Sequence, residues 1–144
     1  MQEVRTDIEI NAPPEKIWEV LIDFERYDEW NPVMEIEGSP TEGTRLDLTL
    51  TYPNQSPTKI RPKVATVNEP SEFRWEGQLF IPHLYDVEHK FVLESFDQGT
   101  RTRFIHSESF RGIAVRLINR IMGADIQEGF EQMNASLKQR VEAT

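Results

Sequence analysis

The stretch YDVEHKFVLESFDQGTRTRFIHSESF, residues 85–110, decides the fold of this 144-residue chain. Apolar and polar residues alternate on both sides of a turn at Asp97-Gln98-Gly99, a pattern typical of two half-buried strands that form a hairpin. On the first strand one face carries Tyr85, His89 and Phe91, whereas the opposite face is mostly charged. The aromatic face is therefore expected to point into the protein interior.

The length of the turn determines which residues of the two strands lie opposite each other. A two- or four-residue loop pairs inward residues with inward residues, whereas a three-residue loop would pair an inward face with an outward one. The register that follows places Phe91 opposite His106 and His89 opposite Glu108, with Cβ atoms about 4.5–5.5 Å apart. We therefore predict that His89 and Glu108 are neighbours on the concave face of a sheet.

The segments around this hairpin predict an α+β domain that spans residues 1–144. A short strand near residues 5–10 precedes two short helices, the first beginning at Pro13-Pro14. Four further strands separated by turn residues lie between residues 33 and 79, and Pro62 indicates an edge or an irregularity in the strand at 59–67. Helical spacing of apolar residues then continues to the end of the chain.

The composition excludes several classes of protein. Cysteine is absent, which excludes disulfides and thiol nucleophiles and fits a cytoplasmic location. No apolar run spans a membrane, and the first ten residues lack a signal-peptide core. The net charge of −9 arises in residues 1–50, which hold thirteen acidic and four basic residues. Such a chain is expected to bind no nucleic acid and to insert in no membrane stably.

Three segments resemble a known family. INAPPEKIWEVLIDF (residues 10–24) and YDEWNP (residues 27–32) are similar to opening motifs of the polyketide cyclase/dehydrase-like branch of the START-like, or SRPBCC, helix-grip superfamily. GFEQMNASLKQRVE (residues 129–142) resembles its closing helix. The resemblance implies a seven-stranded curved antiparallel sheet around a long C-terminal helix, with two short helices after the first strand and a hydrophobic cavity. Such motifs specify a fold rather than a chemistry.

Ten residues are candidates for lining this cavity. His89, His106 and Glu108 are the polar members, which orient a ligand hydroxyl or carbonyl, exchange protons with it, or simply brace the hairpin. A two-histidine, one-carboxylate metal site is not supported by the surrounding pattern, so no metal and no cofactor are expected. The apolar segment 80–82 is a candidate lid. The candidate cavity residues are Leu48, Trp75, Tyr85, His89, Phe91, Phe104, His106, Glu108, Phe130 and Met133.

The leading hypothesis is a non-enzymatic binder or carrier of a small lipophilic molecule. The alternative is a cyclase, dehydratase or isomerase that uses Tyr85, His89, His106 and Glu108, although the sequence contains no catalytic signature. A third hypothesis is a protein-interaction module, in which the arginine-rich region from Arg101 to Arg120 docks a protein partner or a head group. The same arginines also fit a solvated face paired with nearby acids. An interior with no room for a ligand would favour the third hypothesis.

Overall fold

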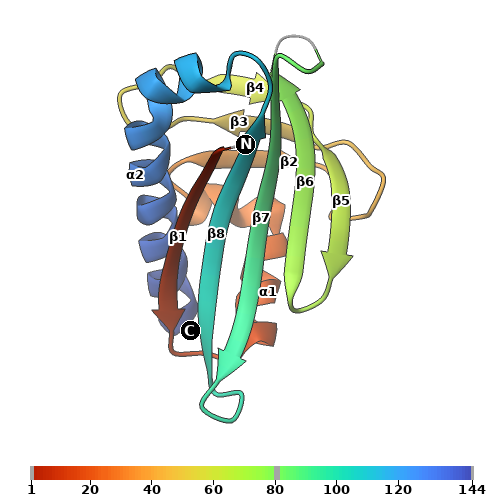
Figure 1. The fold of residues 1–144 in the computed structure, drawn as a ribbon. Coiled ribbons are helices and arrows are strands. Elements are labelled where there is room, and N and C mark those ends of the chain that lie inside the picture. Colours follow the sequence, from red (N-terminus) through yellow and green to blue (C-terminus); the bar gives the residue numbers. More distant parts are fainter. Residues whose placement is uncertain (1, 80–81, 144) are drawn as a thin grey trace.

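The computed structural model describes residues 2–79 and 82–143, and Figure 1 shows their arrangement. Strand β1 (Gln2–Ile10) leads into helix α1 (Pro14–Ile22) and the 3-10 helix η1 (Phe24–Glu29). The two short helices after the first strand were expected, and they are confirmed. After η1, the Asn31 side chain accepts hydrogen bonds from the backbone N–H groups of Val33 and Met34 at 3.0 and 2.9 Å. These bonds turn the chain into the next strand.

The strands form two antiparallel sheets, and the long helix α2 (Val115–Glu142) ends the fold. A three-stranded sheet has the order β2-β3-β4, with β2 (Met34–Glu37), β3 (Asp47–Leu50) and β4 (Thr58–Ile60). A five-stranded sheet has the order β1-β8-β7-β6-β5, with β5 (Lys63–Asn68), β6 (Glu72–Leu79), β7 (Tyr85–Phe96) and β8 (Arg101–Arg111).

The expected seven-stranded sheet is wrong in its strand count, because the described residues form eight strands in two sheets. The strand expected at residues 59–67 is divided at Pro62, which has no backbone N–H to donate to a neighbouring strand. Backbone bonds still join the two sheets beside the break: Leu46 N–H donates to Pro62 O and Val64 N–H donates to Thr44 O, each at 2.9 Å. The curved surface is therefore nearly continuous.

The register expected for the central hairpin is confirmed. His89 pairs with Glu108 and Phe91 with His106 across β7 and β8. A four-residue loop joins the strands, and Asp97, Gln98 and Gly99 adopt positive φ angles of 51°, 59° and 82°. The inward face of the hairpin thus keeps its polar residues beside its aromatic ones.

Helix α2 packs against β1, β8 and α1 and encloses the interior on one side (Figure 1). The expected helix to the end of the chain is confirmed, and its buried side includes Phe130, Met133 and Leu137, all fully buried. Gly129 faces Tyr52 so closely that a Cβ atom there would lie 2.6 Å from the tyrosine ring. Within the described residues, no helix is long and apolar enough to cross a membrane.

Candidate functional site

A chain of hydrogen bonds crosses the interior from β7 to α2. His89 Nδ1 lies 2.5 Å from Glu108 Oε2, and His89 Nε2 lies 2.8 Å from His106 Nε2. His106 Nδ1 lies 2.9 Å from Asn134 Oδ1, and Asn134 Nδ2 donates to Thr6 Oγ1 at 2.8 Å. The Thr6 hydroxyl donates in turn to the backbone carbonyl of His106 at 3.2 Å. We call Thr6, His89, His106, Glu108 and Asn134 the polar chain.

Every residue of the polar chain is buried, from fully buried His106 to Thr6 with 9% of its surface exposed. The alternation of β7 and β8 turns His89, His106 and Glu108 toward α2, where Asn134 meets them from the buried side of the helix. Buried polar groups without partners are costly, and each of these residues has at least one partner. The polar chain therefore also holds the helix on the sheet.

Aromatic rings surround the polar chain. The His89 ring stacks on Trp75 with a centroid separation of 4.6 Å, and the His106 ring stacks on Phe130 at 3.9 Å. Phe91 contacts both histidines, at 5.0 Å from His89 and 4.8 Å from His106. These rings exclude water, so the environment of the histidines has a low dielectric constant.

Burial determines the protonation of the polar chain. Desolvation lowers the pKa of His89 to about 3 and lowers that of His106 well below its ordinary value, the latter also because of the neighbouring His89 charge. Desolvation raises the pKa of the Glu108 carboxyl to about 8. At neutral pH both histidines are therefore neutral and Glu108 carries a proton.

The hydrogen-bond geometry agrees with this assignment. Asn134 uses its amide nitrogen on Thr6, so its oxygen accepts the N–H of His106 Nδ1. His106 Nε2 then accepts from the N–H of His89 Nε2, and His89 Nδ1 is left as an acceptor. The proton in the 2.5 Å contact must come from Glu108. All donors thus point in one direction along the polar chain, from Glu108 to Thr6.

Two tyrosines lie near the Glu108 end. The Tyr52 hydroxyl is buried and has no hydrogen-bond partner among the described residues. The Tyr85 hydroxyl donates to Asn119 Oδ1 at 2.6 Å. Burial, and secondly the charge of Glu108, raises the pKa of both tyrosines. Glu108 Oε1 accepts no hydrogen bond from a described residue, so this end offers a free hydroxyl and a free carboxyl oxygen.

The seven apolar and aromatic candidate cavity residues divide between two apolar clusters. One cluster holds Leu48, Trp75, Phe91, Phe104 and Met133. The other holds Tyr85 and Phe130, together with Tyr52 and Phe110. The structure brings Trp75, Phe91 and Phe130 into contact with the histidines, whereas Leu48 lies on the smaller sheet. Whether any of these residues binds a ligand stays a prediction.

Sequence reasoning missed three residues of this region: Thr6, Tyr52 and Asn134. A signal was present for Tyr52, which continues the inward alternation of Leu46, Leu48 and Leu50. Asn134 lies between Met133 and Leu137 on the buried side of α2, where a polar residue needs a partner. The apolar segment expected to act as a lid has Phe80 and Ile81 outside the described residues, and Pro82 is exposed.

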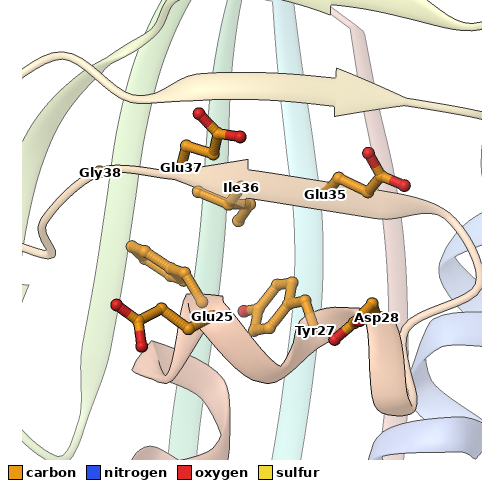
Figure 2. Close-up of a pocket in the computed structure, with 8 residues that line it drawn as sticks. Glu25, Tyr27, Asp28, Glu35, Ile36, Glu37 and Gly38 are labelled. Atoms are coloured by element: carbon orange, nitrogen blue, oxygen red, sulfur yellow. The ribbon is translucent and has the colours of Figure 1, made fainter.

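Two surface pockets lie away from the polar chain. The first, of about 420 Å³, lies between η1 and β2 and is lined by Glu25, Asp28, Glu35 and Glu37. Figure 2 shows Ile36 pointing toward η1, whereas Glu35 and Glu37 point away from it. The second, of about 560 Å³, shares the two β2 glutamates and includes Leu48. Among the described residues, no group of three histidine or acidic side chains is placed to hold a metal ion.

Curved antiparallel strands around a long C-terminal helix, with two short helices after the first strand, define a helix-grip fold. A family comparison agrees with the geometry: this chain belongs to the polyketide cyclase / dehydrase and lipid transport family, whose model matches residues 1–142. No curated protein matches the chain in a sequence comparison.

Solved structures share the fold at low sequence identity. A protein from Thermus thermophilus aligns with a TM-score of 0.75 and 21% identity, covering 99% of this chain and 98% of its own. Protein Ms6760 from Mycobacterium smegmatis aligns with a TM-score of 0.75 and 18% identity, covering 98% and 91%. The Zhui aromatase/cyclase from Streptomyces sp. R1128 aligns with a TM-score of 0.73 and 14% identity, covering 98% and 93%. These likenesses concern the fold.

Proposed function

We propose that this protein binds a small lipophilic molecule at the Glu108 end of the polar chain. The observation that carries the proposal is the buried Tyr52 hydroxyl, which has no partner among the described residues and lies near a carboxyl with one free oxygen. A buried hydroxyl without a partner costs free energy, and a ligand hydroxyl or carbonyl removes that cost. The aromatic surroundings favour a flat, apolar ligand body.

Entry of the ligand requires the segment around Tyr52 to move, because the Tyr52 ring packs 6.2 Å from the Phe130 ring and against Gly129. This segment is held on α2 by the side chains of Asn54 and Gln55, which donate to the Asp125 carboxylate at 3.3 and 2.6 Å. The Asn54–Asp125 bond is exposed and the Gln55–Asp125 bond only partly buried, so both can exchange with water at modest cost.

A titration with the uncharged fluorophore N-phenyl-naphthylamine tests the binding site. Saturable binding at one site per chain is expected, with naphthol competing more strongly than naphthalene because only naphthol offers a hydroxyl. Tyr52→Phe should remove the preference for naphthol, whereas the exposed control Glu35→Gln should keep it. Equal competition by both molecules in the wild type would exclude the proposed polar contact.

A second candidate function is acid–base catalysis at the same place. Glu108 holds a proton with a pKa of about 8, in the range where a carboxyl both donates and regains a proton near neutral pH. The description of the family to which the chain belongs includes dehydrases, which supports testing a dehydration. In such a step Glu108 protonates a ligand hydroxyl as its C–O bond breaks and water leaves. The electrons of the adjacent C–H bond form the new C=C bond, and the Glu108 carboxylate takes the released proton and so regains its own.

Native mass spectrometry of the freshly purified protein separates the two candidates. A co-purifying molecule that keeps its mass during incubation supports binding. A molecule that loses one water in the wild type but not in Glu108→Gln supports catalysis. The glutamine variant is the right comparison because its amide still donates to His89 but cannot transfer a proton.

A further inference from the structure

The first half of α2 exposes large apolar side chains on the side that faces away from the sheets. Ile113, just before the helix, has 89% of its surface exposed, and Leu117 and Ile121 have 64% and 69%. Leu117 and Ile121 lie on one side of the helix, one turn apart, and Ile113 precedes them by the same spacing in the turn that leads into the helix. We call these three residues the exposed stripe. The opposite side of the same turns packs on the second apolar cluster through Val115 and Ile118.

Exposed arginines accompany the stripe. Arg116 and Arg120 lie in the same turns of α2, and neither forms an ion pair with a residue that the structure describes. Arg101, by contrast, is paired with Glu9 at 3.0 Å and Asp97 at 3.2 Å. From residue 101 to residue 124 the only acidic residue is buried Glu108. The interpretation that these arginines are paired with nearby acids therefore holds for Arg101 at the start of β8 but not for Arg116 and Arg120 in α2.

The charges at the beginning of α2 also oppose the helix dipole. Acidic residues stabilise a helix N-terminus and basic residues destabilise it. The first turn of α2 has no acidic residue, and no side chain caps the helix at Ala114. Unpaired Arg116, which lies in this first turn, is therefore unfavourable for folding. An anionic partner would offset this cost.

We propose that the exposed stripe docks on the surface of a lipid bilayer that contains anionic lipids. Aliphatic side chains one turn apart, flanked by arginines, are the pattern of helices that lie in the plane of a membrane interface. A protein partner would need a groove that is complementary to this single helix ridge. The fluid headgroup region of a bilayer needs none, because it adapts to the ridge. Arginines near an anionic surface add attraction.

The docking is peripheral, since the helix is not a membrane span. The acidic residues of positions 1–50 oppose the attraction, so binding is expected to be reversible and to depend strictly on anionic lipid. It would bring the part of α2 that contacts Tyr85 through Asn119 close to the lipid. This inference concerns a surface of the protein and does not depend on the proposed ligand site.

Vesicle flotation of the whole chain tests the docking. We expect the wild type to float with vesicles of phosphatidylcholine and phosphatidylglycerol, to remain unbound with phosphatidylcholine alone, and to dissociate at high salt. The variants Leu117→Ser/Ile121→Ser and Arg116→Gln/Arg120→Gln should each weaken binding by roughly tenfold or more. The control Arg26→Gln/Arg61→Gln removes the same charge from exposed arginines that pair with Asp23 and Asp47, and it should bind like the wild type or only slightly less.

Three outcomes would overturn the proposal: no flotation of the wild type, equal flotation with uncharged vesicles, or equal losses in the Arg116/Arg120 variant and its control. A wild-type dimer that the Leu117/Ile121 variant disperses, without vesicle binding, would instead assign the stripe to a second copy of the chain. Because the substituted side chains are exposed, the melting temperatures should stay near that of the wild type. If the Leu117→Ser/Ile121→Ser variant unfolds, the comparison of Arg116→Gln/Arg120→Gln with its control Arg26→Gln/Arg61→Gln tests the docking alone. Unchanged N-phenyl-naphthylamine binding by all variants keeps this test separate from that of the ligand site.

Discussion

His89 Nδ1 and Glu108 Oε2 lie 2.5 Å apart at directly opposed positions of β7 and β8. With both histidines neutral, the proton in this contact belongs to Glu108. The interior thus holds an uncharged carboxylic acid beside two uncharged imidazoles. The pKa of each of these three groups differs between the folded and the unfolded chain, so the free energy of unfolding must depend on pH.

We expect the free energy of unfolding to reach its maximum near pH 6.5. Above this pH only the folded chain keeps the Glu108 proton, so stability falls as the pH rises toward the folded pKa of about 8. Below pH 6.5 the two histidines bind protons in the unfolded chain but stay neutral in the folded chain. These two protons outnumber the one that the folded chain holds on Glu108, so the free energy of unfolding falls as the pH falls. Urea unfolding from about pH 5 to pH 9 should show a rise of about 1.4 kcal/mol per pH unit below pH 6. Between pH 6.5 and about pH 8 it should show a shallower fall, below about 1 kcal/mol per pH unit.

Glu108→Gln should remove the decline above pH 6.5. The glutamine amide donates to His89 Nδ1 as the carboxylic acid does, but it does not ionise. The fall of about 1 kcal/mol between pH 6.5 and about pH 8 should therefore disappear in urea unfolding. Glu108→Ala is the matched comparison, since it leaves His89 Nδ1 without a donor and should cost about 1–3 kcal/mol at pH 6.5. A decline that persists in the glutamine variant would place the titrating group elsewhere.

The sequence predicted the part of the site that depends on alternation. Strands of period two separate an inward from an outward face, so His89, His106 and Glu108 were placed on the concave side. A loop length that keeps these faces matched then placed His89 opposite Glu108. The division of the strand near Pro62 was anticipated only as an edge position or an irregularity, because a single proline does not say to which sheet each half belongs.

The rest of the site depends on contacts between distant segments. Asn134 meets His106 only because α2 crosses the sheet at one particular rotation and height, which helical periodicity does not specify. Thr6 joins them from β1, 100 residues from His106 and 128 from Asn134 in the chain. The direction in which the hydrogen-bond donors of the polar chain point follows from these two contacts. Sequence patterns therefore could not predict it.

The two tyrosines near Glu108 should respond oppositely to loss of the hydroxyl. Tyr52→Phe removes a buried hydroxyl without a partner and should raise the free energy of unfolding by about 1 kcal/mol. Tyr85→Phe removes the bond to Asn119 Oδ1 and should lower it by about 1 kcal/mol. Urea unfolding of both variants at one pH provides the comparison. Equal destabilisation would mean that the Tyr52 hydroxyl already has a partner, such as an ordered water, and would weaken the proposed ligand contact.

The two glycines of α2 should also respond oppositely to alanine. Alanine is favoured over glycine in a helix by about 1 kcal/mol, so Gly123→Ala should stabilise the fold, since its Cβ meets nothing within 4 Å. At Gly129 the new Cβ would lie 2.6 Å from Cδ1 and 3.2 Å from Cε1 of Tyr52, so the ring must move.

Overpacking of this kind costs about 1–3 kcal/mol, so Gly129→Ala should destabilise the fold on balance. Thermal unfolding of the two variants measures the difference. Because the displaced ring belongs to the proposed ligand site, Gly129→Ala should also change the affinity for N-phenyl-naphthylamine, whereas Gly123→Ala should not. A stabilised Gly129 variant with unchanged affinity would show that Tyr52 yields without cost and that the ligand lies elsewhere.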